Sequence, residues 1–220
     1  MDIITAVKGR KSIRGYLTKP VPVELVREIL EISRRAPSAL NTQPWEITAV
    51  AGEVLEKIQR ENIELLEAQV PAVERSDYQA LYKSRARELG IELFRLMGIQ
   101  RDDREARNQW IQRGFRFFDA PVGIVISVDK SLSEGSTWAI YDCGAIAQTI
   151  CLVAMEYGLG TCIEQQAVVY SDVIKKHTGI TQDKEVVMGI AMGYPDPDFP
   201  ANANISKRAP FDETISLVGF

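Results

Sequence analysis

The sequence predicts an α+β protein in which a central sheet is covered by helices. Helical and strand-like hydrophobic patterns interleave along the chain without the strict alternation that a doubly wound parallel sheet requires. Residues 136–160 form a long, unusually apolar helical pattern that ends at Gly158 and Gly160, so we expect this helix to be buried on most sides. With 45% hydrophobic residues, the 220-residue chain can bury one sizeable core.

The first half of the chain is predicted to be mainly helical. Its apolar residues recur three or four positions apart, as Ile3, Ile4 and Val7 do near the N-terminus, and one short alternating run has the pattern of a strand. In chain order, the expected elements are helices at residues 1–10 and 21–37, a strand at 46–52, a helix at 52–71 and charged helical segments between 76 and 118.

The second half supplies most of the expected strands. A continuous apolar run at residues 120–129 is typical of a strand that is buried on both faces. A short helix is expected at residues 171–179, with Ser171 as its N-cap. The remaining strands are expected at residues 161–168 and 185–195. Because no internal repeat or low-complexity linker interrupts these patterns, we expect residues 1–220 to form a single domain.

Composition and charge argue against several classes of function. The 26 basic and 30 acidic residues give a net charge of -4, which argues against a general nucleic-acid-binding protein. The N-terminal residues contain no apolar stretch of signal-peptide length, and the most apolar run, residues 121–128, is too short to cross a bilayer. We therefore expect a cytoplasmic protein that binds neither nucleic acid nor membranes.

Cysteine and histidine usage argues against a metal site and against a hydrolytic triad. Cys143, Cys151 and Cys162 have no C-x-x-C spacing, and the first two are expected to be buried on one helix face. His177 is the one histidine, in a Lys-rich segment where a polar surface role is expected. The sequence "GLGTC" follows a helix rather than a strand, and no P-loop pattern occurs, so neither common nucleotide-binding motif is present.

A dense group of polar residues follows the first helix, in the sequence "GRKSIRGY" at residues 9–16. Arg10, Lys11, Ser12 and Arg14 combine guanidinium, ammonium and hydroxyl donors, which together can neutralise and hydrogen-bond a phosphate. In an extended segment the even-numbered residues point to one side, so Arg10, Ser12 and Arg14 would face one ligand. Taken alone, a cluster of this size is more often a solvated loop.

A second polar stretch, "RRAPSALNTQPWEI" at residues 34–47, closes the second helix and enters the first strand. Pro37, Ser38, Ala39 and Asn41 would allow close approach to a flat polar ligand, although ordinary loops have the same composition. Together, the two stretches resemble the R-x-S-x-R/K and P-S-x-x-N-x-Q-P-W motifs of the FMN-dependent nitroreductase family.

The resemblance covers essentially the whole chain. Residues 141–162 resemble the long D-x-G-x-A-x-Q helix of that family and its G-L-G-T-C turn, and "SKRAPFDETI" at residues 206–215 resembles its late phosphate-binding segment. Residues 82–122 are similar to a nitrobenzoate-reductase-like branch. The resemblance implies a nitroreductase-like fold with a mainly antiparallel central sheet, a long buried central helix and an intertwined homodimer with FMN sites at the interface.

The resemblance also implies which residues bind the FMN phosphate. Arg10 and Ser12 would bind it from one side, while Arg208, and less directly Lys207, would close the other side. Lys11 would reach ribityl or phosphate oxygens. Ser206 stands where some members of the family carry a further lysine.

Other residues are implied at the flavin ring. Arg14 would lie at the pyrimidine edge, where a cation stabilises the negative charge of the reduced flavin. Gln165 and Gln166 stand where many relatives have a glycine, which leaves the hydrogen-bond donor to flavin N5 open. The residues implied along the ring are Pro37, Ser38, Ala39 and Asn41, which would line the FMN of the partner subunit, and Ile163, Glu164 and Gln165, on the face opposite the substrate.

The implied mechanism is ping-pong. NADH or NADPH would pass a hydride to flavin N5 and leave, and a nitroaromatic or quinone would then take two electrons. Because the flavin carries the chemistry, no acid–base dyad is expected in the protein. Trp138, Tyr82 and Phe94 are candidate aromatic residues of the acceptor pocket, with core packing as the favoured role of each.

Two alternatives stay open from the sequence. A flavin reductase, enone reductase or dehalogenase of the same fold would differ in its acceptor, and "ERSDYQALYKSR" at residues 74–85 contains the Glu, Tyr and Lys types that a halotyrosine deiodinase lid needs. From another class, the chain could be a non-catalytic protein that binds FMN or another phospho-ligand. Turnover of NAD(P)H would separate these possibilities.

Overall fold

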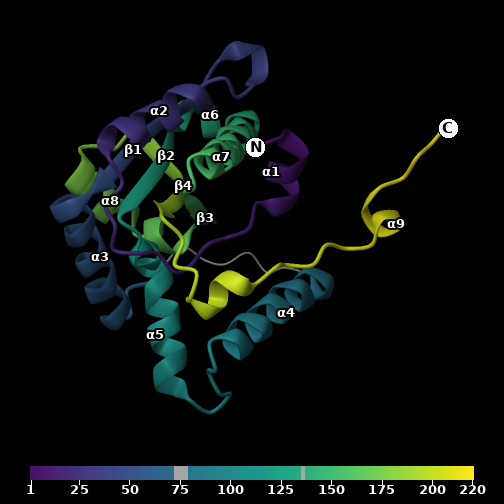
Figure 1. Cartoon of the computed structure of the whole chain (residues 1–220). Coiled ribbons are helices and arrows are strands. Elements are labelled where there is room, and N and C mark those ends of the chain that lie inside the picture. The colour runs from purple at the N-terminus through teal and green to yellow at the C-terminus, as the bar shows by residue number, and fades with distance from the viewer. Residues whose placement is uncertain (72–78, 135–136) are drawn as a thin grey trace.

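The computed structural model describes residues 1–71, 79–134 and 137–220. These residues form a four-stranded sheet in the order β1-β2-β4-β3, in which every neighbouring pair is antiparallel (Figure 1). The strands are Trp45–Ala51 (β1), Val122–Asp129 (β2), Gly160–Glu164 (β3) and Lys184–Gly193 (β4). The predicted α+β class and the mainly antiparallel sheet are confirmed.

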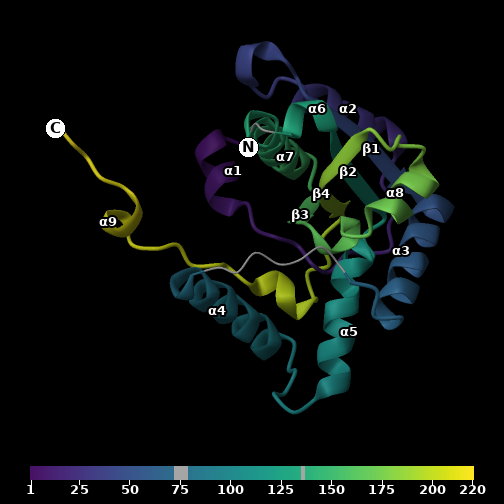
Figure 2. The same ribbon diagram turned by 180° about the vertical axis from the view of Figure 1, so that it is seen from behind.

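Helices cover both faces of this sheet (Figure 1 and Figure 2). In the described part of the chain they are Ile3–Gly9 (α1), Val23–Ser33 (α2), Gly52–Glu67 (α3), Ala80–Leu96 (α4), Arg104–Phe115 (α5), Lys130–Ser133 (α6), Trp138–Glu156 (α7), Ser171–Thr178 (α8) and Phe211–Thr214 (α9). On one face, α2 and α7 bury Ile29, Ile146 and Ile150 against the strands. On the other face, α3 and α8 contribute Ile58 and Ile174 to a second core cluster.

The central elements explain the most apolar stretches of the sequence. In β2, Ile124 and Ile126 pack in the cluster that contains α7, whereas Val125 packs in the opposite cluster. A strand that is covered on both faces has no polar side, which accounts for its continuous apolar run. Eight residues of α7 are buried, Cys143 and Cys151 among them, so the predicted buried central helix is confirmed.

The helix α7 is the one helix of the described residues that is long and apolar enough to cross a membrane by length and composition. Cys143, Ile146 and Ile150 of this helix are fully buried within the protein. The core of the protein therefore accounts for the hydropathy of α7.

Three local predictions were wrong. Ser171 is the first residue of α8 rather than its N-cap, because Tyr170 occupies the cap position without a side-chain hydrogen bond. Trp138 and Tyr82 were expected to pack in the core, but their side chains are 66% and 51% exposed. Phe94 is half-buried beneath the Arg107 guanidinium, 5.2 Å from its ring centre. The possible deiodinase lid at residues 74–85 falls partly outside the described residues.

Candidate active site

The basic segment that follows α1 is fixed to the edge of the sheet in an extended conformation. Ser12 forms a parallel bridge with Thr161 of β3, and the Ile13 amide donates to the Thr161 carbonyl at 2.9 Å. Gly160 permits this close approach, because a Cβ at that position would lie 2.5 Å from Ile13 Cγ1. Arg10 has the extended backbone that the sequence predicts, and the contacts of Ser12 and Ile13 with Thr161 hold the segment beside β3.

Side chains of this segment differ in environment from one position to the next. Ile13 is 6% exposed, whereas Ser12 and Arg14 are half-buried. The Cys162 thiol of β3 donates to the Ile163 carbonyl at 3.7 Å. Burial raises the pKa of that thiol to about 12, and the nearby Arg14 cation opposes the rise. A thiol that stays protonated is a poor nucleophile, so this cluster is suited to binding rather than to thiol chemistry.

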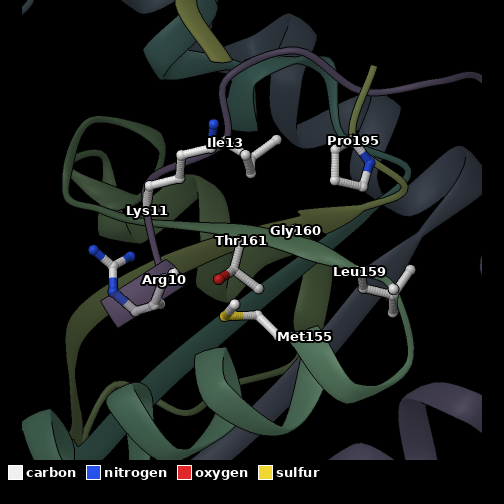
Figure 3. Close-up of a pocket in the computed structure, with 10 residues that line it drawn as sticks. Arg10, Lys11, Ile13, Met155, Leu159, Gly160, Thr161 and Pro195 are labelled. Carbon is white, nitrogen blue, oxygen red and sulfur yellow. The ribbon is translucent and has the colours of Figure 1, made fainter. Parts of the chain in front are cut away.

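The first two cations of the segment line a hollow between the ends of α1 and α7 and the start of β3 (Figure 3). Arg10, Lys11, Met155 and Thr161 contribute to its wall, and its volume is about 220 Å³. Pockets that enclose a small-molecule ligand usually measure about 300–1,000 Å³. The hollow can therefore hold one end of a mononucleotide, and other residues must enclose the remainder.

Two side chains from distant parts of the sequence hold the backbone at Arg14. Asn202 accepts hydrogen bonds from the amides of Arg14 and Gly15, at 2.8 and 3.2 Å, and donates to the Gly15 carbonyl at 2.8 Å. Arg113 of α5 donates to the Arg14 carbonyl at 3.1 Å and pairs with Asp119 at 2.7 Å. Sequence reasoning missed Asn202 and Arg113, because no local pattern marks a residue whose partner lies about a hundred or more positions away.

Glu164, at the end of β3, lies close to Arg14 but without a hydrogen-bond partner among the described residues. Glu164 is 8% exposed, and both of its carboxylate oxygens are buried. Burial raises the pKa of Glu164 well above the usual range of a carboxyl, and the Arg14 cation opposes this rise. The Arg14 guanidinium itself lies over the Phe118 ring, 5.8 Å from its centre.

The residues on either side of Glu164 have more open environments. Ile163 is 39% exposed, and the Gln165 side-chain amide donates to the Val187 carbonyl at 3.0 Å. Residues 163–165 therefore lie beside the basic segment, since Thr161 of the same strand pairs with it. The structure thus brings together two of the groups that the sequence analysis assigned to one cofactor.

A third predicted group lies at the end of α2 and is held by the central helix. The Ala39 amide donates to Asp142 of α7 at 3.1 Å. Leu40 beside it has a φ of 51° and is 98% exposed. A positive φ is costly for a leucine, and its side chain gains no burial within the single chain. The predicted members of the group are Pro37, Ser38, Ala39 and Asn41.

The predicted cations of the tail lie apart from the basic segment. Arg208 donates to the carbonyl and to the hydroxyl of Ser206, both at 2.9 Å. Together with Lys207 it lines a groove of about 900 Å³ between α4 and residues 204–213, and no residue of the 10–14 segment lines that groove. Within one chain, the cations expected on the two sides of the phosphate are therefore not brought together.

Comparisons with known proteins agree with this fold. The model of the Nitroreductase family matches residues 7–194. A nitrobenzene nitroreductase of Ectopseudomonas oleovorans is 31% identical over 96% of this chain and 95% of its own length, and a 4-nitrobenzoate reductase of Pseudomonas putida is 30% identical over 100% and 96%. The solved structure of the FMN and NADPH-dependent nitroreductase NfnB from Sphigopyxis sp. strain HMH has a TM-score of 0.93 at 27% identity and covers 100% of both chains. That of the FMN-dependent nitroreductase NfnB from Mycobacterium smegmatis in complex with NADPH has a TM-score of 0.89 at 26% identity and covers 97% and 96%.

Proposed function

This chain belongs to the nitroreductase family, and from that premise we propose that it is a flavoprotein oxidoreductase that uses NADH or NADPH to reduce a nitroaromatic or quinone through bound FMN. One observation carries the proposal. Residues 10–14 present two guanidinium groups, an ammonium and a hydroxyl from an extended segment that is hydrogen-bonded to β3. This donor set suits a phosphate at one end and an anionic ring edge at the other.

The first residues of the segment would hold the phosphate end of FMN. Arg10 and Lys11 line the hollow beside α7, and Ser12 is fixed by its bridge to Thr161. Two cations and a hydroxyl would neutralise and hydrogen-bond a phosphate there. Since β3 holds the backbone of this segment, little further ordering of the main chain is needed on binding.

Arg14 would serve the redox end of the cofactor. FMN supplies the hydride chemistry when it is bound, first accepting two electrons from NAD(P)H and then passing them to the acceptor in a ping-pong sequence. The part of Arg14 is to hold a fixed positive charge where negative charge develops. Asn202 and Arg113 keep its backbone in place during both half-reactions.

A homodimer is the assembly that would complete the site. The single chain leaves apolar side chains exposed on three separate segments, and its tail extends away from the body (Figure 1 and Figure 2). A second copy could cover these side chains and could bring the η1 loop (Ala39–Asn41) and the tail cations to the FMN of its partner. On these three segments, the exposed apolar residues are Ile3, Ile4 and Val7 of α1, Leu40 of the loop, and Ile205, Phe211, Ile215, Leu217, Val218 and Phe220 of the tail.

Cofactor content and turnover test the proposed function. The purified protein is expected to be yellow, to release FMN on denaturation and to oxidise NADH or NADPH when 4-nitrobenzoate or a quinone is added. Sedimentation of the loaded protein should give the mass of two chains. A colourless protein that takes up no FMN from solution would contradict the proposal.

The same measurements separate the alternatives. A protein that binds FMN but oxidises neither nicotinamide would be a flavin or phospho-ligand binding protein. Turnover with an enone or a halogenated aromatic, but with neither nitroaromatics nor quinones, would indicate another reductase or a dehalogenase of this fold. A cytoplasmic location stays a prediction from the sequence.

A further inference from the structure

Glu164 is the most isolated polar side chain of the site. Both of its carboxylate oxygens are buried and have no hydrogen-bond donor among the described residues. A buried carboxylate without partners is costly, and removing its charge by protonation is the usual remedy. The protonation state of Glu164 therefore depends on the charges beside it.

The ionisable groups around Glu164 leave Arg14 as its one close cation in the described part of the chain. The ionisable groups that interact electrostatically with Glu164 are Arg14 and Tyr16 of the basic segment and Cys162 of its own strand. Burial raises the pKa of Tyr16 and that of Cys162, so both groups stay neutral near pH 7. Opposite Glu164 on β4 is Gly189, which carries no side chain.

The neighbouring cation on α5 is already neutralised. Arg113 pairs with Asp119 at 2.7 Å and donates to the carbonyls of Arg14 and Phe118, both at 3.1 Å. A negative charge that arrives beside Arg14 is therefore expected to change the pKa of Glu164 more than that of any other group.

We propose that Glu164 is a proton store of the FMN site, which binds one proton when NAD(P)H delivers a hydride and releases it when the electrons leave for the acceptor. This inference rests on the proposed function. At a pH above the raised pKa that Glu164 has in the oxidised site, this residue is a carboxylate that the Arg14 cation stabilises. When negative charge arrives beside Arg14, that stabilisation is lost and the carboxylate takes a proton from solvent.

The two half-reactions balance. In the first, NAD(P)H gives a hydride, which carries two electrons and one proton, to the bound FMN and becomes NAD(P)⁺. Glu164 binds a second proton from solvent. In the second, a nitro group receives the hydride equivalent and one proton from solvent, so that one N–O bond breaks and nitroso product and water form. Glu164 returns its proton to solvent at this stage and is again a carboxylate beside Arg14.

Proton uptake on reduction is the direct test. FMN-loaded protein would be reduced anaerobically with one equivalent of NADH in weakly buffered solution, and the protons bound would be measured with an indicator dye across about pH 6 to 9. The wild-type protein should take up as much as one proton more than Glu164→Gln, within a window bounded by the Glu164 pKa values of the oxidised and reduced protein. Both of these pKa values should lie above the usual range of a carboxyl.

Two controls accompany this comparison. Glu56→Gln removes an exposed carboxyl from α3 and should leave proton uptake unchanged. The infrared difference spectrum of the wild-type protein, reduced minus oxidised, should show the gain of a carboxylic acid C=O band in the same pH window. This second readout requires no variant, so it holds even if Glu164→Gln fails to fold.

The outcomes distinguish this inference from the proposed function. Equal proton uptake by wild type and Glu164→Gln at every pH, or an infrared difference spectrum without a carboxylic acid band, would overturn the proton store while leaving NAD(P)H turnover intact. A wild-type protein that binds no FMN would overturn both proposals. Additional uptake that disappears in Glu164→Gln and persists in Glu56→Gln supports the inference.

Discussion

At the scale of single residues, Arg14 and Glu164 set the electrostatics of the site. Arg14 is half-buried over an aromatic ring, and Glu164 is buried without a hydrogen-bond donor among the described residues. Each residue therefore interacts strongly with any charge placed beside it, because little water is present to screen the interaction. Substitutions at these two positions are expected to change redox and titration behaviour more than they change the fold.

Arg14→Ala is expected to lower the reduction potential of bound FMN and to slow its reduction by NAD(P)H on the order of 100-fold, as loss of a positioned charge partner does in other enzymes. The binding of oxidised FMN should weaken far less, since the negative charge that Arg14 stabilises is present only after reduction. Spectroelectrochemistry and stopped-flow reduction measure the first two quantities. Arg14→Lys keeps the charge and should recover part of the rate, whereas equal loss of affinity in both redox states would contradict this role.

Glu164→Gln is expected to change how the stability of the FMN-free protein depends on pH. Burial raises the pKa of Glu164 in the folded protein, so the folded state keeps a proton that the unfolded state has lost. The free energy of unfolding therefore falls as pH rises from the unfolded-state pKa of about 4.3 to the folded-state pKa, and this contribution is constant above it. Urea unfolding at several pH values should show that the fall is smaller in Glu164→Gln, while Glu56→Gln follows the wild type.

At the scale of elements, two isolated bridges hold the basic segment against the edge of the sheet. Ser12 pairs with β3, and Tyr16 pairs with Pro195. Between them, Asn202 accepts a hydrogen bond from the Arg14 amide. The predicted donors for the cofactor are thus placed by backbone contacts with residues outside the segment itself. Disturbing the contact with β3 should displace all of these donors together.

Gly160→Ala tests this contact. The added Cβ would lie 2.5 Å from Ile13 Cγ1, so the segment must move, and we expect a loss of about 1–3 kcal/mol in stability together with weaker FMN binding. Gly90→Ala is a matched control in α4, because nothing lies within 4 Å of its new Cβ and a helical alanine is usually stabilising. Chemical denaturation and FMN titration measure both effects. Unchanged FMN affinity in Gly160→Ala would argue against the segment as the cofactor site.

At the scale of the whole molecule, the predicted site is divided among parts that one chain keeps separate. The basic segment lies on β3, the loop at Ala39–Asn41 lies against α7, and the tail cations line a groove beside α4. The exposed apolar side chains of α1 and of the tail indicate that a further surface belongs against them. A dimer that exchanges these parts would make cofactor binding depend on assembly.

Arg208→Ala is expected to weaken FMN binding about tenfold, and equally in the oxidised and reduced states, because the phosphate carries the same charge in both. Titration of FMN-free protein, with and without reductant, measures this effect. Arg60→Ala, on the exposed face of α3, is the matched control and should leave FMN affinity unchanged. A larger effect of Arg208→Ala in one redox state would place its side chain near the ring instead of the phosphate.

Local patterns in the sequence predicted the main elements, although the strand expected at residues 161–168 ends at Glu164 and gives way to a 3-10 helix. The continuous apolar runs of β2 and α7 predicted their burial, since a segment covered on all sides has no polar face. The basic stretch at residues 10–14 was assigned to a cofactor only together with the second polar stretch and the family resemblance, because a cluster of this size alone is more often a solvated loop. The exposure of Trp138 and Tyr82 was not predicted, because apolar periodicity does not distinguish a helix face that packs in the core from one that stays exposed.

The sequence by itself predicted the main helices and strands and the donors that would bind a phosphate, because both predictions depend on side chains near one another in the chain. The tertiary structure alone decided that Asn202 and Arg113 hold Arg14, that Glu164 is buried without a hydrogen-bond partner among the described residues, and that Arg208 lies away from Arg10. These facts depend on contacts between residues far apart in the chain. The balance of burial and charge at such contacts is settled only when the elements pack.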